Sequence, residues 1–201
     1  MKTIILFSLA LIFTANAAHV PAPVLDFDGQ YLHTGAKYYV MPAALDCENG
    51  GLLSVKFNRK PCPAGVEQSR RSDETGLPLT FTPVNPKKGV IRLSIDVNIK
   101  FLASTGCDDE STIWKVKYDK ALKQYAVMVG GVEGNPGPET LENCFKIEKT
   151  KDGYKLVFCP SVCSYCKVMC KAIGIVDDED GSQRLVLNND PASFVFFWKT
   201  N

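Results

Sequence analysis

Four cysteines gather near the end of the chain, at positions 159, 163, 166 and 170, with the spacing Cys-x3-Cys-x2-Cys-x3-Cys. Four thiolates this close together can bind zinc, and Cys163 with Cys166 has the Cys-x-x-Cys spacing of a redox pair. Disulfides are the third reading, and they persist in oxidising compartments but are rare in the cytosol. The other end of the chain decides between these readings.

Residues 1–18 have the features of a signal peptide. Lys2 precedes an apolar run over residues 4–13, and Ala15-Asn16-Ala17 matches a small-x-small cleavage pattern. The apolar run is shorter than the roughly 20 residues that span a bilayer, so we expect no membrane association after the signal is removed. Residues 19–201 are then expected to form one domain in an oxidising compartment.

Export favours two nested disulfides in the cysteine run over the other two readings. Zinc sites of this kind usually divide into two cysteine pairs that are a dozen or more residues apart. A redox pair would need a βαβ context, which the sequence does not provide. We therefore expect no metal site here.

Charge and histidine content exclude several function classes. The net charge is +1, about zero without Lys2, and no basic stripe predicts nucleic-acid binding. Only His19 and His33 could act as a histidine base, and neither lies in a recognisable catalytic arrangement, so we expect neither an enzyme nor a cofactor. The acidic run 177–180 could attract calcium, but residues 181–184 do not continue an EF-hand loop, which favours a solvated turn.

Short β-rich segments separated by turns fill the rest of the chain. No window longer than ten residues has a convincing helical apolar period after the signal. This pattern predicts an all-β barrel or sandwich and does not choose between them. The expected strands cover residues 37–41, 52–57, 79–82, 90–95, 97–101, 113–118, 125–129, 145–149, 154–158, 184–187 and 194–198.

Several ordered motifs resemble those of plant Kunitz inhibitors of the soybean trypsin inhibitor type, in the miraculin-like branch. They include Val-Leu-Asp-Phe-Asp-Gly at 24–29, Asn-Pro-Lys-Lys-Gly-Val-Ile-Arg at 85–92, Gly-Asn-Pro-Gly-Pro-Glu-Thr at 134–140 and the cysteine run itself. The resemblance covers nearly the whole mature chain. It implies a β-trefoil of twelve short strands with pseudo-threefold symmetry, stapled by disulfides.

The same resemblance implies which cysteines pair. It joins Cys159 to Cys170, Cys163 to Cys166, and Cys62 to Cys107. Two cysteines remain, Cys47 and Cys144, and Cys144 replaces a Trp that relatives usually carry. The even total of eight suggests a fourth bridge between them; an intermolecular bond or free thiols are the alternatives. We expect a monomer, with a disulfide-linked dimer as the alternative.

The resemblance also implies a substrate-like reactive loop and a target protease as partner. The reactive residues are Pro86, Lys87, Lys88 and Gly89. We expect the loop that contains them, residues 82–92, to project into solvent at a distance from the disulfide-rich end of the molecule. Lys87 or Lys88 would enter the acidic specificity pocket of a trypsin-like serine protease. From the residues alone, this stretch is an ordinary polar hairpin tip.

Two departures from the family pattern weaken the expected inhibition. Thr34 stands where inhibitory members often anchor the loop with Asn, and the loop is longer than in the soybean type, so no single specificity residue is fixed by alignment. The implied function is a secreted endopeptidase inhibitor with a role in defence, in the apoplast or alternatively the vacuole. A non-inhibitory binding or storage protein on the same scaffold is the competing hypothesis.

Overall fold

The computed structural model describes residues 20–43, 48–56, 62, 64–85, 89–103 and 111–199, so the expected signal peptide lies outside it. No helix in these ranges is long and apolar enough to cross a membrane. The described residues form one 3-10 helix, η1 (Pro138–Asn143), and twelve strands. The strands are β1 (Tyr38–Pro42), β2 (Leu52–Val55), β3 (Gly65–Gln68), β4 (Leu79–Pro83), β5 (Val97–Phe101), β6 (Lys115–Asp119), β7 (Gln124–Met128), β8 (Lys146–Lys149), β9 (Tyr154–Phe158), β10 (Lys171–Asp177), β11 (Gln183–Asn188) and β12 (Phe194–Trp198).

Six of the strands close into a barrel. β1 pairs with β12 and β4, β4 with β5, β8 with β9, and β9 with β12, all antiparallel. The ring closes between β5 and β8, where Val97 and Phe145 exchange backbone hydrogen bonds of 2.8 and 3.0 Å. Closure leaves no free edge among these strands, which protects them from pairing with another chain.

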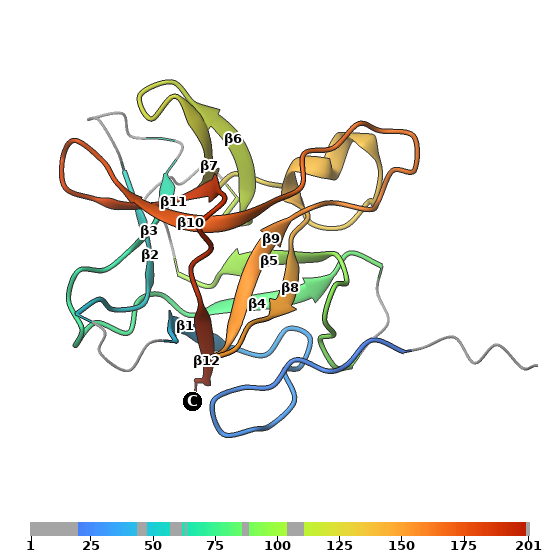
Figure 1. Cartoon of the computed structure of the whole chain (residues 1–201). Coiled ribbons are helices and arrows are strands. Elements are labelled where there is room, and N and C mark those ends of the chain that lie inside the picture. Colours follow the sequence, from blue (N-terminus) through green and yellow to red (C-terminus); the bar gives the residue numbers. More distant parts are fainter. Residues whose placement is uncertain are drawn as a thin grey trace, which may run out of the picture.

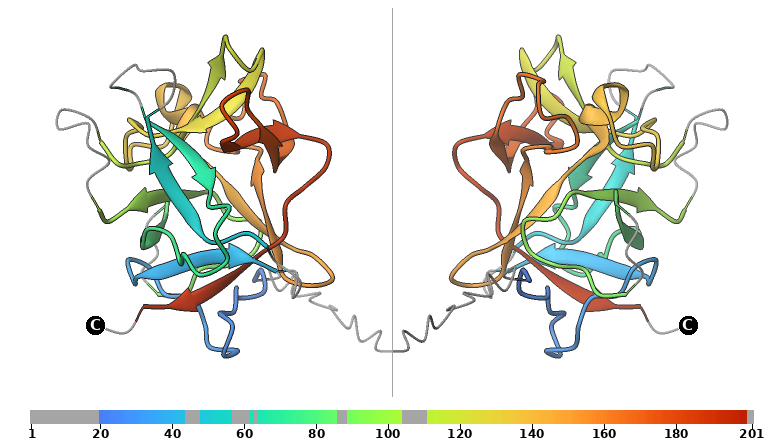
Figure 2. Two further views of the ribbon diagram at one scale, coloured as in Figure 1. Left: turned by 90° about the vertical axis from the view of Figure 1, so that its left-hand side faces the viewer. Right: turned by 90° about the vertical axis from the view of Figure 1, so that its right-hand side faces the viewer.

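Three hairpins cover one end of the barrel. These are β2–β3, β6–β7 and β10–β11, and their second strands pair with one another in a triangle, β3 with β7, β7 with β11, and β11 with β3. Figures 1 and 2 show the β6–β7 and β10–β11 hairpins above the barrel, with the N-terminal segment at the opposite end. This arrangement is the expected β-trefoil.

Alternating burial along the strands fills the barrel interior. In β12, Phe194 and Phe196 are buried, whereas the residues that alternate with them are partly exposed. The ring of Phe196 lies edge-on to Phe81, with 5.2 Å between centroids, and is tilted against Tyr154, with 5.4 Å between centroids. Burying an aromatic side chain of this size stabilises a fold by about 2–3 kcal/mol. The core therefore joins β4 to β9 and β12, which lie far apart in the sequence.

The expected strand at 90–95 is wrong. Val90 and Arg92 make only isolated bridges, to His33 and Pro23 of the N-terminal segment. Ser94 then takes a positive φ of 59°, which ends any extended run. The chain here crosses the barrel end instead of entering its wall.

Candidate functional site

The candidate reactive loop joins β4 to β5. These strands pair over five residues, and beyond them the Val84 N–H donates to the Asp96 carbonyl at 2.9 Å. Three of the expected reactive residues, Pro86, Lys87 and Lys88, lie outside the described residues, whereas Gly89 lies within them.

The segment that can project is shorter than expected. We expected residues 82–92 to face solvent, but Pro83, Val84 and Ile91 are buried. Ile91 is fixed because its N–H donates to the Leu32 carbonyl at 2.7 Å. Of the described residues between 82 and 92, only Asn85 and Gly89 are exposed. The described flanks of the loop are therefore built into the barrel, close to the expected reactive residues.

The N-terminal segment supports the far side of the loop. The Thr34 N–H donates to the Gly89 carbonyl at 2.8 Å, one residue beyond the bridge between His33 and Val90. Gly89 has φ 133°, a region that other residues rarely adopt, so glycine suits this anchoring point. The Thr34 hydroxyl oxygen, in contrast, is buried and has no hydrogen-bond partner among the residues that the structure describes. The position where relatives often carry an anchoring Asn thus supports the loop through its backbone alone.

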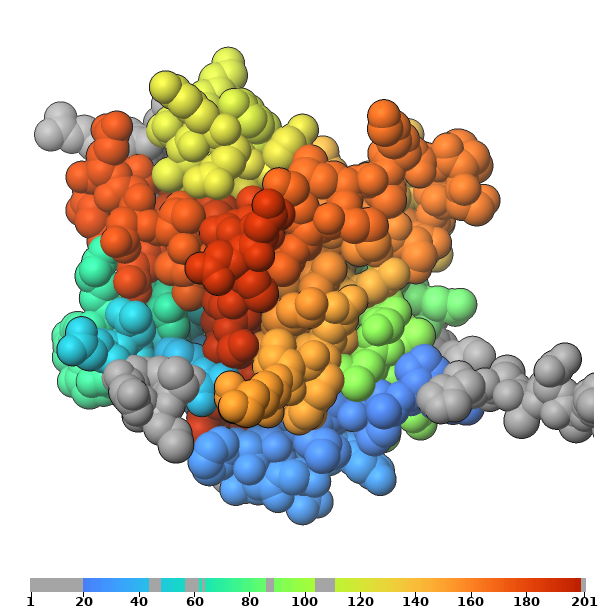
Figure 3. Space-filling view, viewed as in Figure 1, coloured from blue at the N-terminus to red at the C-terminus, as the bar shows by residue number. Residues whose placement is uncertain are grey.

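The cysteine run forms an arm with two disulfides. Cys159 is bonded to Cys170 and Cys163 to Cys166, the two pairs that the resemblance implies. The arm stands out from the body in the space-filling view, in orange at the upper right (Figure 3). Tyr165 lies within the inner disulfide ring and is 82% exposed. The arm therefore presents a large aromatic side chain to solvent on a covalently closed loop.

This arm is not separate from the reactive-loop hairpin, which differs from our expectation. The backbone N–H of Ser161 donates to Asp96 Oδ2 at 3.0 Å, and the Ser161 hydroxyl donates to the same oxygen. Lys146 Nζ lies 3.8 Å from the other carboxylate oxygen. Sequence reasoning missed both Ser161 and Asp96, because no local pattern connects residues 65 positions apart.

The remaining cysteines have different environments. Cys62 is disulfide-bonded, but the expected partner Cys107 lies outside the described residues, as does Cys47. Cys144 is a free, fully buried thiol, so the proposed fourth bridge between Cys47 and Cys144 is not formed. Its Sγ donates to the Thr140 carbonyl at 3.2 Å. A thiol buried in this way cannot reach a second molecule, so a dimer could not be linked through Cys144.

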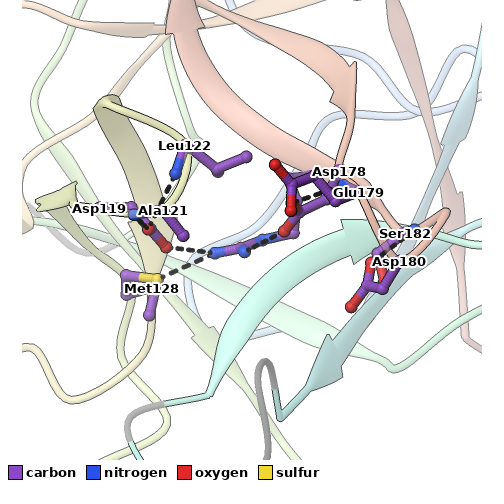
Figure 4. Close-up of polar contacts among 9 residues, drawn as sticks. Asp119, Ala121, Leu122, Met128, Asp178, Glu179, Asp180 and Ser182 are labelled. Carbon is purple, nitrogen blue, oxygen red and sulfur yellow. Dashed lines mark hydrogen bonds and ion pairs between the residues drawn. The ribbon is translucent and has the colours of Figure 1, made fainter.

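Two residues of the acidic run near the β10–β11 turn form ion pairs with different arginines. Asp177 pairs with Arg70 at 2.6 Å, and Asp178 pairs with the buried Arg184 at 3.1 Å. Asp119 approaches Arg184 from the β6–β7 hairpin at 3.2 Å, so two hairpins converge on one guanidinium (Figure 4). No group of three or more potential metal ligands gathers among the described residues.

A histidine base is not held in the part of the chain that the structure describes. His33 lies edge-on to Trp198, with 6.4 Å between the ring centroids. Its backbone N–H donates to the Tyr38 hydroxyl at 2.8 Å, but no described residue hydrogen-bonds or ion-pairs with the imidazole. The candidate site is therefore the loop between β4 and β5, and His33 is not assigned a catalytic role in it.

Comparison with known proteins defines the family. The model of the legume Kunitz family, described as "Trypsin and protease inhibitor", matches residues 24–197. The chain belongs to this Kunitz family. It is 43% identical to miraculin from Synsepalum dulcificum over 216 residues, covering 98% of this chain and 97% of that protein.

Solved structures of Kunitz proteins show the range of ligands within the fold. The Kunitz-type cysteine protease inhibitor PCPI-3 from potato is 32% identical, with a TM-score of 0.77 over 90% of this chain and 100% of that one. The water-soluble chlorophyll protein from Brassica oleracea var. Botrytis, solved with chlorophyll b, is 27% identical, with a TM-score of 0.72 over 89% and 99%. The Kunitz family thus contains protease inhibitors and binding proteins.

Proposed function

We propose that this Kunitz protein is a secreted endopeptidase inhibitor that blocks trypsin-like serine proteases through the loop between β4 and β5. Lys87 or Lys88 acts as the specificity residue and enters the acidic pocket of the protease. Cleavage of the signal at residues 17–18 delivers a monomeric domain, over 19–201, to the apoplast, where it limits the proteases of insects or pathogens.

The observation that carries the proposal is the support on both flanks of the loop. The Val84 N–H is bonded to Asp96 on one side, and the Gly89 carbonyl is bonded to Thr34 on the other. A loop whose ends are fixed loses less conformational freedom when a protease binds it, and freedom lost on binding weakens affinity. The same anchors would keep the two ends together if the loop were cut.

The test is inhibition by the mature, disulfide-bonded protein against trypsin, chymotrypsin, a papain-like protease and an aspartic protease. We expect inhibition of trypsin, and we expect Lys87→Ala with Lys88→Ala to weaken it by at least about 100-fold, as loss of a central interface anchor does. The matched control is Lys117→Ala with Lys120→Ala, because both lysines are exposed on the β6–β7 hairpin, outside the loop between β4 and β5. Equal inhibition by the parent and the loop variant would assign the site elsewhere.

The competing function is a non-inhibitory binding protein. The unpartnered Thr34 hydroxyl favours it, because the loop lacks a side-chain anchor at this position. Absence of inhibition against all four proteases would make this second function the better account.

A further inference from the structure

A surface cleft of about 350 Å³ opens at the end of the barrel opposite the hairpin cap. Its lining residues come from the N-terminal segment and the end of β12, and these two segments lie at the bottom of the molecule in Figure 1. Its volume is in the range of small-molecule sites. The lining residues are Asp26, Asp28, Gln30, Tyr31, His33 and Trp198.

One wall of the cleft carries two carboxylates. Asp26 is only 8% exposed, and its Oδ1 accepts the backbone N–H groups of Asp28 (3.1 Å) and Gln30 (2.8 Å). No described residue donates a hydrogen bond to its second oxygen, Oδ2. A nearly buried carboxylate with a free acceptor attracts a hydrogen-bond donor that carries positive charge. Asp28 adds a second, exposed carboxylate.

The charge of Asp26 also acts on Tyr38, which packs against Trp198. Burial raises the pKa of Tyr38, the hydrogen bond from His33 opposes this effect, and the nearby Asp26 carboxylate raises the pKa further. Among the described residues that line the cleft there is no lysine or arginine to neutralise the two carboxylates. An anionic ligand would therefore be repelled.

The cleft is also lined by two large aromatic side chains, Tyr31 and Trp198. Trp198 is 46% exposed and Tyr31 is 52% exposed. The Trp198 ring is held edge-on against Tyr38, with 5.5 Å between centroids and 84° between planes. Exposed aromatic faces attract cations that carry hydrocarbon, since the ring supplies both a negative face and an apolar surface.

Backbone pairing preforms the cleft. Trp198 pairs with Tyr38 in the β1–β12 register, and Leu25 bridges Tyr31 across the turn at 26–30. That turn is closed by the Asp26 N–H donating to the Gln30 carbonyl at 2.8 Å. A ligand would therefore meet walls that need little reordering.

We propose that this cleft binds a small organic cation, a protonated alkyl amine. Its ammonium group donates to Asp26 Oδ2 and lies near Asp28, while its methylene groups pack on Trp198 and Tyr31. This binding is independent of protease inhibition and uses none of the residues of the reactive loop.

Calorimetric titration of the mature protein with spermidine tests the proposal, together with tryptophan emission. The chain has two tryptophans, and because Trp114 is fully buried, a change in emission on binding should come from Trp198. We expect saturable binding that weakens about 10-fold in Asp26→Asn and in Trp198→Leu, a loss typical of one charged contact or one cation–aromatic contact. Asp152→Asn is the matched control, because Asp152 is an exposed carboxylate on the β8–β9 turn.

The variants separate specific binding from other effects. Asn at position 26 keeps the acceptor for the two backbone N–H groups, and Trp198→Phe keeps an aromatic wall while removing the emission signal. Unchanged affinity in Asp26→Asn and Trp198→Leu overturns the proposal, as does absence of saturation. Equal binding of magnesium ion would reduce the site to unspecific charge attraction, and equal binding of glucose would assign it to neutral sugars; either result also overturns it.

Discussion

Ser161 is bonded to Asp96 through both its backbone N–H and its hydroxyl, although the two residues are 65 positions apart. Asp96 also accepts the Val84 N–H through its backbone carbonyl, at the point where the candidate reactive loop begins. One aspartate thus joins the disulfide arm to the base of the loop. The arm can stiffen the loop without contacting a protease itself.

Ser161→Ala tests this link. We expect the free energy of unfolding to fall by about 1.5 kcal/mol, the lower value for one hydrogen bond to a charged group. The loss is limited to one bond because the backbone N–H of residue 161 still donates to Asp96. Urea denaturation at neutral pH gives the value. Ser164→Ala is the control, because Ser164 is exposed on the same arm. If the two variants unfold at the same urea concentration, the hydroxyl does not contribute.

Thr34 offers two substitutions with opposite readouts. Thr34→Val removes a buried hydroxyl that has no partner, so we expect stability to rise by about 1 kcal/mol and inhibition to stay unchanged. Thr34→Asn supplies amide donors beside the loop, and we expect inhibition to strengthen by about 3- to 10-fold, because one added hydrogen bond is worth about 0.5–1.5 kcal/mol. Thermal unfolding and inhibition constants measure the two effects. Weaker inhibition by Thr34→Asn would show that this residue cannot support the loop.

Glu67 makes stability depend on pH. Burial raises its pKa, the Ser182 hydrogen bond lowers it, and the charge of Asp180 raises it again. A carboxyl whose pKa is higher in the folded state favours folding below its unfolded pKa of about 4.3, and this contribution is lost as pH rises through the folded pKa.

We therefore expect Glu67→Gln to be more stable than the parent at pH 7, by less than about 1 kcal/mol because the side chain is partly solvated. The difference should vanish below about pH 4. Urea denaturation between pH 4 and pH 7 checks it, with Glu133→Gln as the exposed control. A variant that is less stable at pH 7 contradicts the assignment.

Ten of the strands could be predicted from the sequence, because β-branched and aromatic residues cluster in them. The prediction missed β3 and β10: β3 contains Gly65, Glu67 and Gln68, and β10 is interrupted by Gly174, all residues that are uncommon in strands. Gly174 is required there, since a Cβ would lie 2.3 Å from the Asp190 carbonyl oxygen. Tertiary contact, not local preference, fixes these two strands.

The candidate site was predictable to a smaller extent. The resemblance to family motifs located the loop between β4 and β5. The pattern of short β-rich segments, by itself, could not distinguish a barrel from a sandwich. The supports of the loop depend on contacts across the barrel, such as Thr34 to Gly89 and Ser161 to Asp96, which only the closed fold creates. The wrong strand at 90–95 has the same origin, because Val90 and Arg92 pair with the N-terminal segment.

Cys144 should be unreactive in the folded protein. Burial, together with the charge of Asp96 and against the opposing charge of Lys146, raises the pKa of its thiol to about 12. At pH 8 only about one molecule in 10,000 then carries the thiolate, the form that reacts. We expect iodoacetamide to leave Cys144 unmodified until denaturant is added, as measured by peptide mass spectrometry without reductant. Rapid labelling of the native protein would show that the thiol is accessible.

Arg184 should be the most sensitive charged residue in the hairpin cap. Its guanidinium is fully buried and pairs with Asp119 and Asp178. Asp119 uses its other oxygen to accept the Ala121 N–H at 2.8 Å, so the arginine also steadies the β6–β7 turn (Figure 4). Arg184→Leu leaves two poorly solvated carboxylates without a cation, and we expect it to cost about 3–5 kcal/mol of unfolding free energy.

The triple variant Arg184→Leu, Asp119→Asn, Asp178→Asn removes the whole ionic group. Since replacing a complete buried ion cluster is often neutral, we expect it to regain most of the stability that Arg184→Leu loses. Asn at position 119 retains the acceptor for Ala121, so the turn is preserved. Urea denaturation of the parent, single and triple variants gives the comparison. If the triple variant is no more stable than the single one, the cost of losing Arg184 is lost packing and not uncompensated charge.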